Sequence, residues 1–290
     1  MVKKDNVYLF SEKNREYKII RELSQSEVEK IEYANEVLHE FLYFERRFEV
    51  INRNYKEYHE TVYRYSKNRK DGIKINKEYM NETFVEINRT FINFISSLKS
   101  YSEHLDIKLA NKYPNKEEYL NFKKAVSLIY DNNFSYKFLS ILRDYAIHYN
   151  FPIQIVRIKG NRIEDSEDFT KELIIEFEKE KLLKNPRMKK KLGKDLEKYN
   201  NFFPVQFIVH DIKKIFIQLF NEFLKVEKTF YQEQANLFQK FLSENINTDT
   251  TCYGKITKKG DTDFIYETIV IQENIVKRLN ELLNESPFKN

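Results

Sequence analysis

The chain has 290 residues, with 50 Lys and Arg against 45 Asp and Glu, and its formal net charge is +5. A hydrophobic content of 41% and an aromatic content of 15% exclude an intrinsically disordered chain, and no apolar run approaches the roughly 18 residues of a membrane-spanning helix. The single cysteine, Cys252, excludes an internal disulfide and a cysteine-based zinc site. We therefore expect a cytoplasmic protein with no membrane partner.

The positive charge is concentrated in one segment. Nine basic and three acidic residues lie between Lys179 and Lys198, a local charge of +6, so the other 270 residues sum to −1. The run Lys189, Lys190 and Lys191 would bind phosphate groups if it lay beside an RNA site. The alternative interpretation is a solvated helix face.

The first half of the sequence predicts long helices. The whole chain contains only five glycines and five prolines, and these residues break helices. After a short hairpin within residues 7–20, Ser26 and Glu29 have the spacing of a capping box at a helix start. Apolar residues then recur at helical spacing over four segments, residues 26–65, 80–113, 115–130 and 134–149. Short connections between these helices predict an antiparallel bundle.

The pattern changes after Pro152. Alternating apolar residues predict a β-hairpin within residues 153–177, then the basic segment, and then a long helix over residues 205–244. A second small hairpin within residues 253–266 and a C-terminal helix complete the chain. The predicted fold is mainly α, a long-helix antiparallel bundle with a small C-terminal part that contains β-hairpins.

This change divides the predicted organisation at residue 151. Residues 1–151 form the helical bundle with a short N-terminal extension, and residues 152–290 form a mixed accessory region. The sequence leaves open whether the accessory region packs on the bundle or folds separately.

Several kinds of site are absent from the sequence. The five glycines form no phosphate-binding loop. His39 is followed by Glu40, but position 43 is Tyr, so the zinc motif HExxH is incomplete. Glu36 and His39 match the ExxH pattern of di-iron bundles, which need a second copy that the chain lacks. We expect no metal and no cofactor.

One constellation remains, near the end of the fourth predicted helix. Arg143, Asp144 and His148 lie within six residues. Asp144 and His148 are four residues apart and share a helix face, so the carboxylate is positioned to orient the imidazole. Arg143 can flank the same side. The alternative is a surface cluster of ion pairs at a helix end.

The segment Leu142–Pro152 resembles the HEPN superfamily of helical domains. The family signature is Arg, four to six residues, and then His, often with a polar residue directly after the Arg, and Arg143, Asp144 and His148 match each position. The resemblance extends over roughly residues 26–152 and includes uncharacterised bacterial HEPN-like proteins. HEPN toxins paired with nucleotidyltransferase antitoxins have Tyr two residues after the His, where this chain has Asn150.

The resemblance implies a metal-independent endoribonuclease that acts as a homodimer. Arg143 would bind phosphate and His148 would transfer protons. Asp144 would support these two side chains from behind, and Tyr145 or Tyr149 would contact RNA. It further implies a role in antiviral defence or toxin-type growth arrest, with a protein inhibitor or activator as a partner. The alternative is a non-catalytic helical binding or regulatory module that acts by dimerisation or through a protein partner. An RNA-binding protein that uses the basic segment is a third hypothesis.

Overall fold

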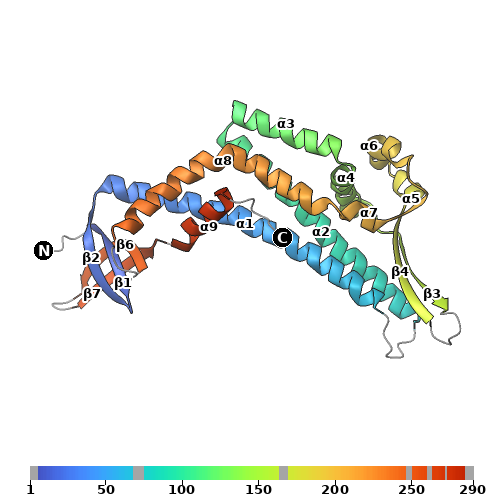
Figure 1. Cartoon of the computed structure of the whole chain (residues 1–290), viewed down its shortest axis with the longest axis horizontal. Helices are drawn as coiled ribbons and strands as arrows, with labels where there is room; N and C mark the ends of the chain where they lie inside the picture. Colours follow the sequence, from blue (N-terminus) through green and yellow to red (C-terminus); the bar gives the residue numbers. More distant parts are fainter. Residues whose placement is uncertain are drawn as a thin grey trace. The chain divides into compact units, whose positions relative to one another are not determined.

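The computed structural model describes residues 6–67, 75–162, 169–245, 250–259, 263–271 and 273–284 (Figure 1). As predicted, the fold is mainly α with long helices and small antiparallel sheets. Contacts divide the chain into one compact unit of residues 1–46 and 224–290 and a second of residues 47–223. This division differs from the predicted one at residue 151, because β-strands from the two ends of the chain pair with each other.

The first unit contains a four-stranded sheet in the order β2-β1-β6-β7. Its elements are β1 (Val7–Lys13), β2 (Glu16–Leu23), β6 (Thr250–Lys259), β7 (Asp263–Val270) and α9 (Glu273–Asn284), together with parts of α1 (Gln25–Ser66) and α8 (Ile212–Ser243). Both hairpins of this sheet and the C-terminal helix were predicted from the sequence, but the antiparallel pairing of β1 with β6 was not. Alternation along β1 buries Leu9 on one face and places Phe10 in a small aromatic cluster on the other.

The capping box of α1 (Gln25–Ser66) lies two residues before the predicted one. The Ser24 amide donates to Glu27 Oε2 at 2.9 Å, and the Glu27 amide donates to Ser24 Oγ at 3.4 Å. Arg21 of β2 selects this register, because its Nη2 donates to Glu27 Oε1 at 2.8 Å and its Nε donates to Glu244 Oε2 at 2.5 Å. The predicted pair Ser26 and Glu29 is therefore wrong as the cap.

The second unit is built on long helices. Its elements, besides parts of α1 and α8 (Ile212–Ser243), are α2 (Lys77–Lys112), α3 (Glu117–Asn132), α4 (Phe134–His148), β3 (Ile155–Arg162), β4 (Phe169–Glu178), α5 (Lys179–Leu183), α6 (Pro186–Leu196), β5 (Phe202–Pro204) and α7 (Val205–Val209). Aromatic contacts align α1 antiparallel to α2, since Tyr58 meets Phe91 and Phe48 meets Tyr101 with ring centroids 5.3 and 6.1 Å apart. Helix α4 contacts α2, α3, α6 and α7.

The predicted helix over residues 205–244 is two helices. It is interrupted at His210 and Asp211, so that α7 ends at Val209 and α8 begins at Ile212. Asp211 sits just before α8, where a carboxylate interacts favourably with the positive end of the helix dipole, and it pairs with Lys214 at 2.9 Å. The unpredicted strand β5 pairs with the end of β4.

A buried amide fixes the segment that follows α4. The fully buried Asn88 of α2 accepts from the Ile153 amide and donates to the Ile153 carbonyl, both at 3.1 Å. These two hydrogen bonds satisfy the backbone amide and carbonyl of Ile153, at the position where the chain turns from α4 towards β3. Residues 153–223 thus belong to the same compact unit as α2 and α4.

Asn88→Ala is expected to lower the free energy of unfolding by about 1–3 kcal/mol, because it leaves the buried donor and acceptor of Ile153 without partners. Asn81→Ala, at an exposed position of the same helix, is the control and is expected to change stability by less than about 0.5 kcal/mol. Chemical denaturation of both variants measures the difference. Equal stabilities would contradict the structural role of Asn88.

The capping box predicts an acid-dependent stability. Hydrogen bonds from Arg21 and from the Ser24 amide lower the pKa of Glu27 from 4.5 to about 2. Because the folded pKa is depressed, this stabilisation is complete above pH 4.5 and is lost as the pH falls towards 2. Glu27→Gln is expected to cost no more than about 1 kcal/mol at pH 7, since the pair is partly exposed.

Unfolding followed between pH 7 and pH 2 tests this expectation. The stability difference between wild type and Glu27→Gln should shrink as the pH approaches 2. Glu32→Gln, at an exposed position of α1, should show no comparable change. A difference that stays constant over the whole pH range would be inconsistent with the shifted carboxylate.

Candidate functional site

The predicted cluster lies on the C-terminal half of α4. Asn133 caps the helix by accepting from the Tyr136 amide at 2.9 Å. The apolar side chains of one face are buried, among them Phe138, Leu142 and Tyr145. The burial of this face sets the rotation of the helix and leaves His148 exposed at its end.

Asp144 joins two arginines. Arg143 Nη1 donates to Asp144 Oδ1 at 3.1 Å, and Arg187 Nη2 forms an ion pair with Asp144 Oδ2 at 2.7 Å. The side chain of Asp144 is only 15% exposed, whereas those of Arg143 and Arg187 are 26% and 57% exposed. One carboxylate thus holds two guanidinium groups, and the three side chains together carry a net charge of +1.

Arg187 reaches this position from the basic segment. It lies in the first turn of α6, where Asn185 accepts from the amides of Arg187 and Met188, both at 3.0 Å. Pro186 begins the helix, a position where its missing N–H costs nothing. Residues Met188, Leu192 and Leu196, spaced by four, form the buried face of α6. Arg187 belongs to the basic segment, and its ion pair with α4 is not predicted by the sequence.

A small hollow lies between α4 and α6. Its volume is about 110 Å³. It is lined by Ile141, Asp144, Tyr145, His148, Tyr149, Asn185, Arg187 and Met188. The rings of Tyr145 and Tyr149 contact each other with centroids 5.1 Å apart, and burial raises the pKa of Tyr145, so its hydroxyl remains a hydrogen-bond donor at neutral pH. His148, Tyr145 and Tyr149 therefore share one site with Asp144 and Arg187.

Two predicted features of this cluster differ in the structure. Among the described residues, no hydrogen bond or ion pair joins Asp144 to His148, because both carboxylate oxygens bind arginines. The structure thus gives no support to a carboxylate that orients the imidazole. Arg143 is not among the described residues that line the hollow, and its buried Nε has no hydrogen-bond partner within the described part of the chain.

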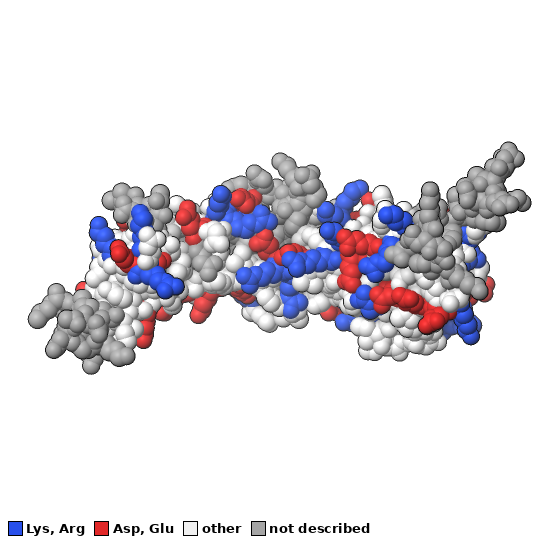
Figure 2. Space-filling model, turned by 90° about the horizontal axis from the view of Figure 1, so that it is seen from below, with Lys and Arg blue, Asp and Glu red and all other residues white. Residues whose placement is uncertain are grey.

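The lysine run lies on the outer side of α6. Lys189, Lys190 and Lys191 are all exposed, whereas Met188 and Leu192 on either side of them are buried. On the face shown in Figure 2, basic and acidic side chains are mixed and neither sign covers an extended area. This mixture agrees with a chain whose charge outside the basic segment is nearly balanced.

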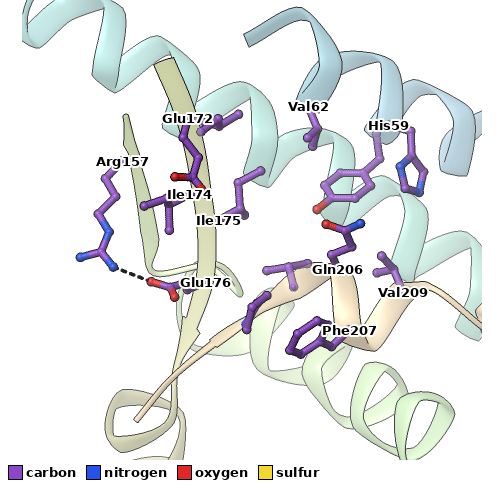
Figure 3. A pocket seen from close by; sticks show the side chains of 14 residues that line it. His59, Val62, Arg157, Glu172, Ile174, Ile175, Glu176, Gln206, Phe207 and Val209 are labelled. Carbon is purple, nitrogen blue, oxygen red and sulfur yellow. Dashed lines mark hydrogen bonds and ion pairs between the residues drawn. The ribbon is translucent and has the colours of Figure 1, made fainter. Parts of the chain in front are cut away.

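A larger hollow lies elsewhere in the second unit. It measures about 470 Å³ and is bordered by α1, β4 and α7 (Figure 3). His59 lines it beside the buried Tyr58, and burial lowers the pKa of His59. The sequence does not predict this hollow, because its walls come from segments almost 150 residues apart.

Comparisons with known proteins identify no relative: no family model, no curated protein and no solved structure matches the chain. Within the described part of the chain, no three His, Cys, Asp or Glu side chains are grouped so that they could hold a metal ion. None of the helices, as far as their residues are described, is long and apolar enough to cross a membrane.

Asp144→Asn is expected to lower the free energy of unfolding by about 1–3 kcal/mol, because hydrogen bonds to charged partners are lost at a largely buried position. Asp131→Asn removes the same charge from an exposed position on α3 and should change stability by less than about 0.5 kcal/mol. Thermal or chemical unfolding compares the two variants. An equal effect of both substitutions would show that Asp144 does not hold α6 on α4.

Proposed function

We propose that the chain is a HEPN-like, metal-independent endoribonuclease that acts at the hollow between α4 and α6. The observation that carries the proposal is the ion pair of 2.7 Å between Arg187 and Asp144, because it places an arginine of the basic segment beside His148. A phosphate-binding cation and a group that can transfer protons thus border the same hollow. The resemblance of Arg143, Asp144 and His148 to the HEPN signature supports the same activity.

The side chains fit cleavage by the 2′-hydroxyl of RNA. The 2′-oxygen forms a bond to phosphorus while the bond from phosphorus to the 5′-oxygen breaks. His148 takes the 2′-hydroxyl proton or supplies a proton to the leaving 5′-oxygen, since an imidazole nitrogen can accept or donate a proton. Arg187, with Arg143 held on the other oxygen of Asp144, offsets the negative charge that develops on the phosphate. The products are a 2′,3′-cyclic phosphate and a 5′-hydroxyl, and no metal is needed.

The remaining predicted contacts with RNA surround this hollow. Tyr149 is exposed and positioned to stack on a base. Lys189, Lys190 and Lys191 on α6 would add nonspecific attraction for the RNA backbone. The hollow of about 110 Å³ is smaller than the roughly 300–1,000 Å³ of sites that enclose a small molecule, which suits a phosphate group on a longer chain.

We propose a homodimer, because exposed apolar side chains flank His148 in the sequence. Ile147, Tyr149 and Phe151 are all exposed, and Phe151 contacts Phe84 of α2 with ring centroids 5.4 Å apart. Such neighbouring apolar side chains typically mark an interface. A second copy at this patch would bring two His148 side chains together, so that one could act as base and the other as acid.

The same patch favours the second candidate, a non-catalytic binding or regulatory module. Ile147, Tyr149 and Phe151 could equally dock a protein partner, and the pairing of Asp144 with both arginines could be purely structural. The wider role, a cytoplasmic protein in antiviral defence or growth arrest under a protein inhibitor or activator, rests on the resemblance to the HEPN superfamily.

His148→Ala is expected to slow RNA cleavage by about 10²- to 10⁴-fold, the usual loss on removing a general acid or base. The assay uses the full chain, a fluorescent random-sequence RNA and EDTA, and detects 2′,3′-cyclic phosphate ends. His210→Ala, at an exposed histidine after α7, is the matched control and should retain the wild-type rate.

Two outcomes would contradict the nuclease proposal. If His148→Ala cleaves RNA as fast as the wild type, the cleavage does not arise at this hollow. If the wild type leaves every RNA intact, including structured transfer RNA, the binding-module candidate is favoured.

A further inference from the structure

Strand β4 has an edge that is only partly covered. It pairs with β3 over Phe169–Glu176, but it pairs with β5 only over Glu176–Glu178. The described strands therefore leave the segment Glu172–Ile175 without a neighbour on the β5 side. Strand edges of this kind are where an added strand can pair.

The direction of the backbone groups follows from the bonds at the end of β4. The Lys179 amide donates to the Asn201 carbonyl on the β5 side at 2.7 Å, and the Glu178 amide donates to Gln154 Oε1 on the β3 side at 3.0 Å. Because backbone groups alternate in direction along an antiparallel strand, the N–H and C=O of Leu173 and Ile175 point to the open side. No described group bonds to them there.

The larger hollow opens onto this edge. Five consecutive residues of β4, Glu172–Glu176, line it. A face of a strand presents only alternate residues, so consecutive lining residues indicate that the hollow runs along the edge. Figure 3 shows Val62 and His59 of α1 opposite Ile175, with Gln206 and Phe207 of α7 below them.

The size and the apolar surface of the hollow suit an extended peptide. Its volume of about 470 Å³ lies within the usual range for occupied sites. Phe207 is 68% exposed at its margin, and Val62, Ile174 and Ile175 provide half-buried aliphatic surface. An added strand would place alternate side chains against this surface while its backbone bonds to β4.

The charge of the hollow favours a basic occupant. Glu172 and Glu176 lie on the same side of β4, and among the described side chains only Glu176 has an ion-pair partner, Arg157 at 2.9 Å. Lys159 is opposite Glu172 in the strand register, yet no ion pair joins them among the described residues. Burial lowers the pKa of His59, so its neutral ring does not offset the carboxylates at pH 7. The site thus has a net negative charge that would repel RNA.

We propose that the open edge of β4 binds an extended, basic peptide segment of a partner protein by strand addition. The peptide continues the sheet where β5 leaves it, and its backbone bonds to Leu173 and Ile175. A Lys or Arg side chain of the peptide pairs with Glu172, and an apolar side chain packs between Val62 and Phe207. The site shares no lining residue with the hollow beside His148, so this inference does not depend on the proposed nuclease activity.

Random heptapeptides displayed on phage and selected on the full chain test the proposal. The selected peptides are expected to carry Lys or Arg and β-branched residues at alternate positions. Fluorescence polarisation of the synthetic consensus peptide should show about threefold to tenfold weaker binding to Glu172→Gln, because one ion pair is lost. Glu180→Gln, at an exposed position on α5, should bind like the wild type.

N-methylation of the consensus peptide tests the backbone pairing. Methyl groups on the amides that point towards β4 should abolish binding, whereas methyl groups on the alternate amides should have little effect. The proposal is overturned if no consensus emerges, if the consensus is acidic, or if binding is insensitive both to Glu172→Gln and to N-methylation. Displacement of the bound peptide by single-stranded RNA would also overturn it.

Discussion

The pair of hydrogen bonds between Asn88 and Ile153 is the constraint on which the second unit depends. A polar side chain in the core is tolerated only where it is satisfied. Asn88 donates to the Phe84 carbonyl within its own helix, and Ile153 supplies its other backbone partners. The bond therefore fixes where the chain leaves α4. Strand β3 begins just after this point, and β4 pairs antiparallel with β3. Helices α5 and α6 follow β4 directly in the chain, so their positions depend on the same constraint.

Aromatic packing also holds the small sheet against helices α2 and α4. Phe177 of β4 contacts Phe91 of α2, Phe138 of α4 and Phe203 of β5, with ring centroids 5.0–6.0 Å apart. These contacts bury one face of the small sheet and hold its end against the bundle. Helix α6 is then close enough to α4 for Arg187 to reach Asp144, which adds an ionic link to the apolar one.

The hollow beside His148 and the hollow along β4 differ in electrostatic character. Arg187 and Asp144 line the hollow beside His148, Arg143 pairs with Asp144 from outside the described lining, and the exposed lysines of α6 lie on the same helix as Arg187. Along the edge of β4, two carboxylates face one arginine. This contrast supports different occupants, a phosphate backbone at the first hollow and a basic peptide at the second. A nuclease whose partner binds at the second hollow would keep its RNA site free.

The sequence by itself determined the long helices and the hairpins, but it did not predict α5, α6 or β5. Apolar spacing predicted the helices and hairpins, because helical and strand periods differ along the chain, and the resemblance around Arg143, Asp144 and His148 selected the candidate residues. It placed the first helix cap two residues late, since Arg21 of β2 decides which glutamate is held. It also missed the break between α7 and α8.

Only the tertiary structure decided which elements meet. The pairing of β1 with β6 and the ion pair of Arg187 with Asp144 each join segments that are far apart in the sequence. The open edge of β4 likewise depends on where β5 stops pairing with it. Local periodicity carries no information on such contacts, because they depend on how buried faces pack rather than on the spacing within any one segment. Asp144 is an example. Its position on the helix predicted a contact with His148, but in the folded chain its two carboxylate oxygens bind Arg143 and, because α6 packs beside α4, Arg187.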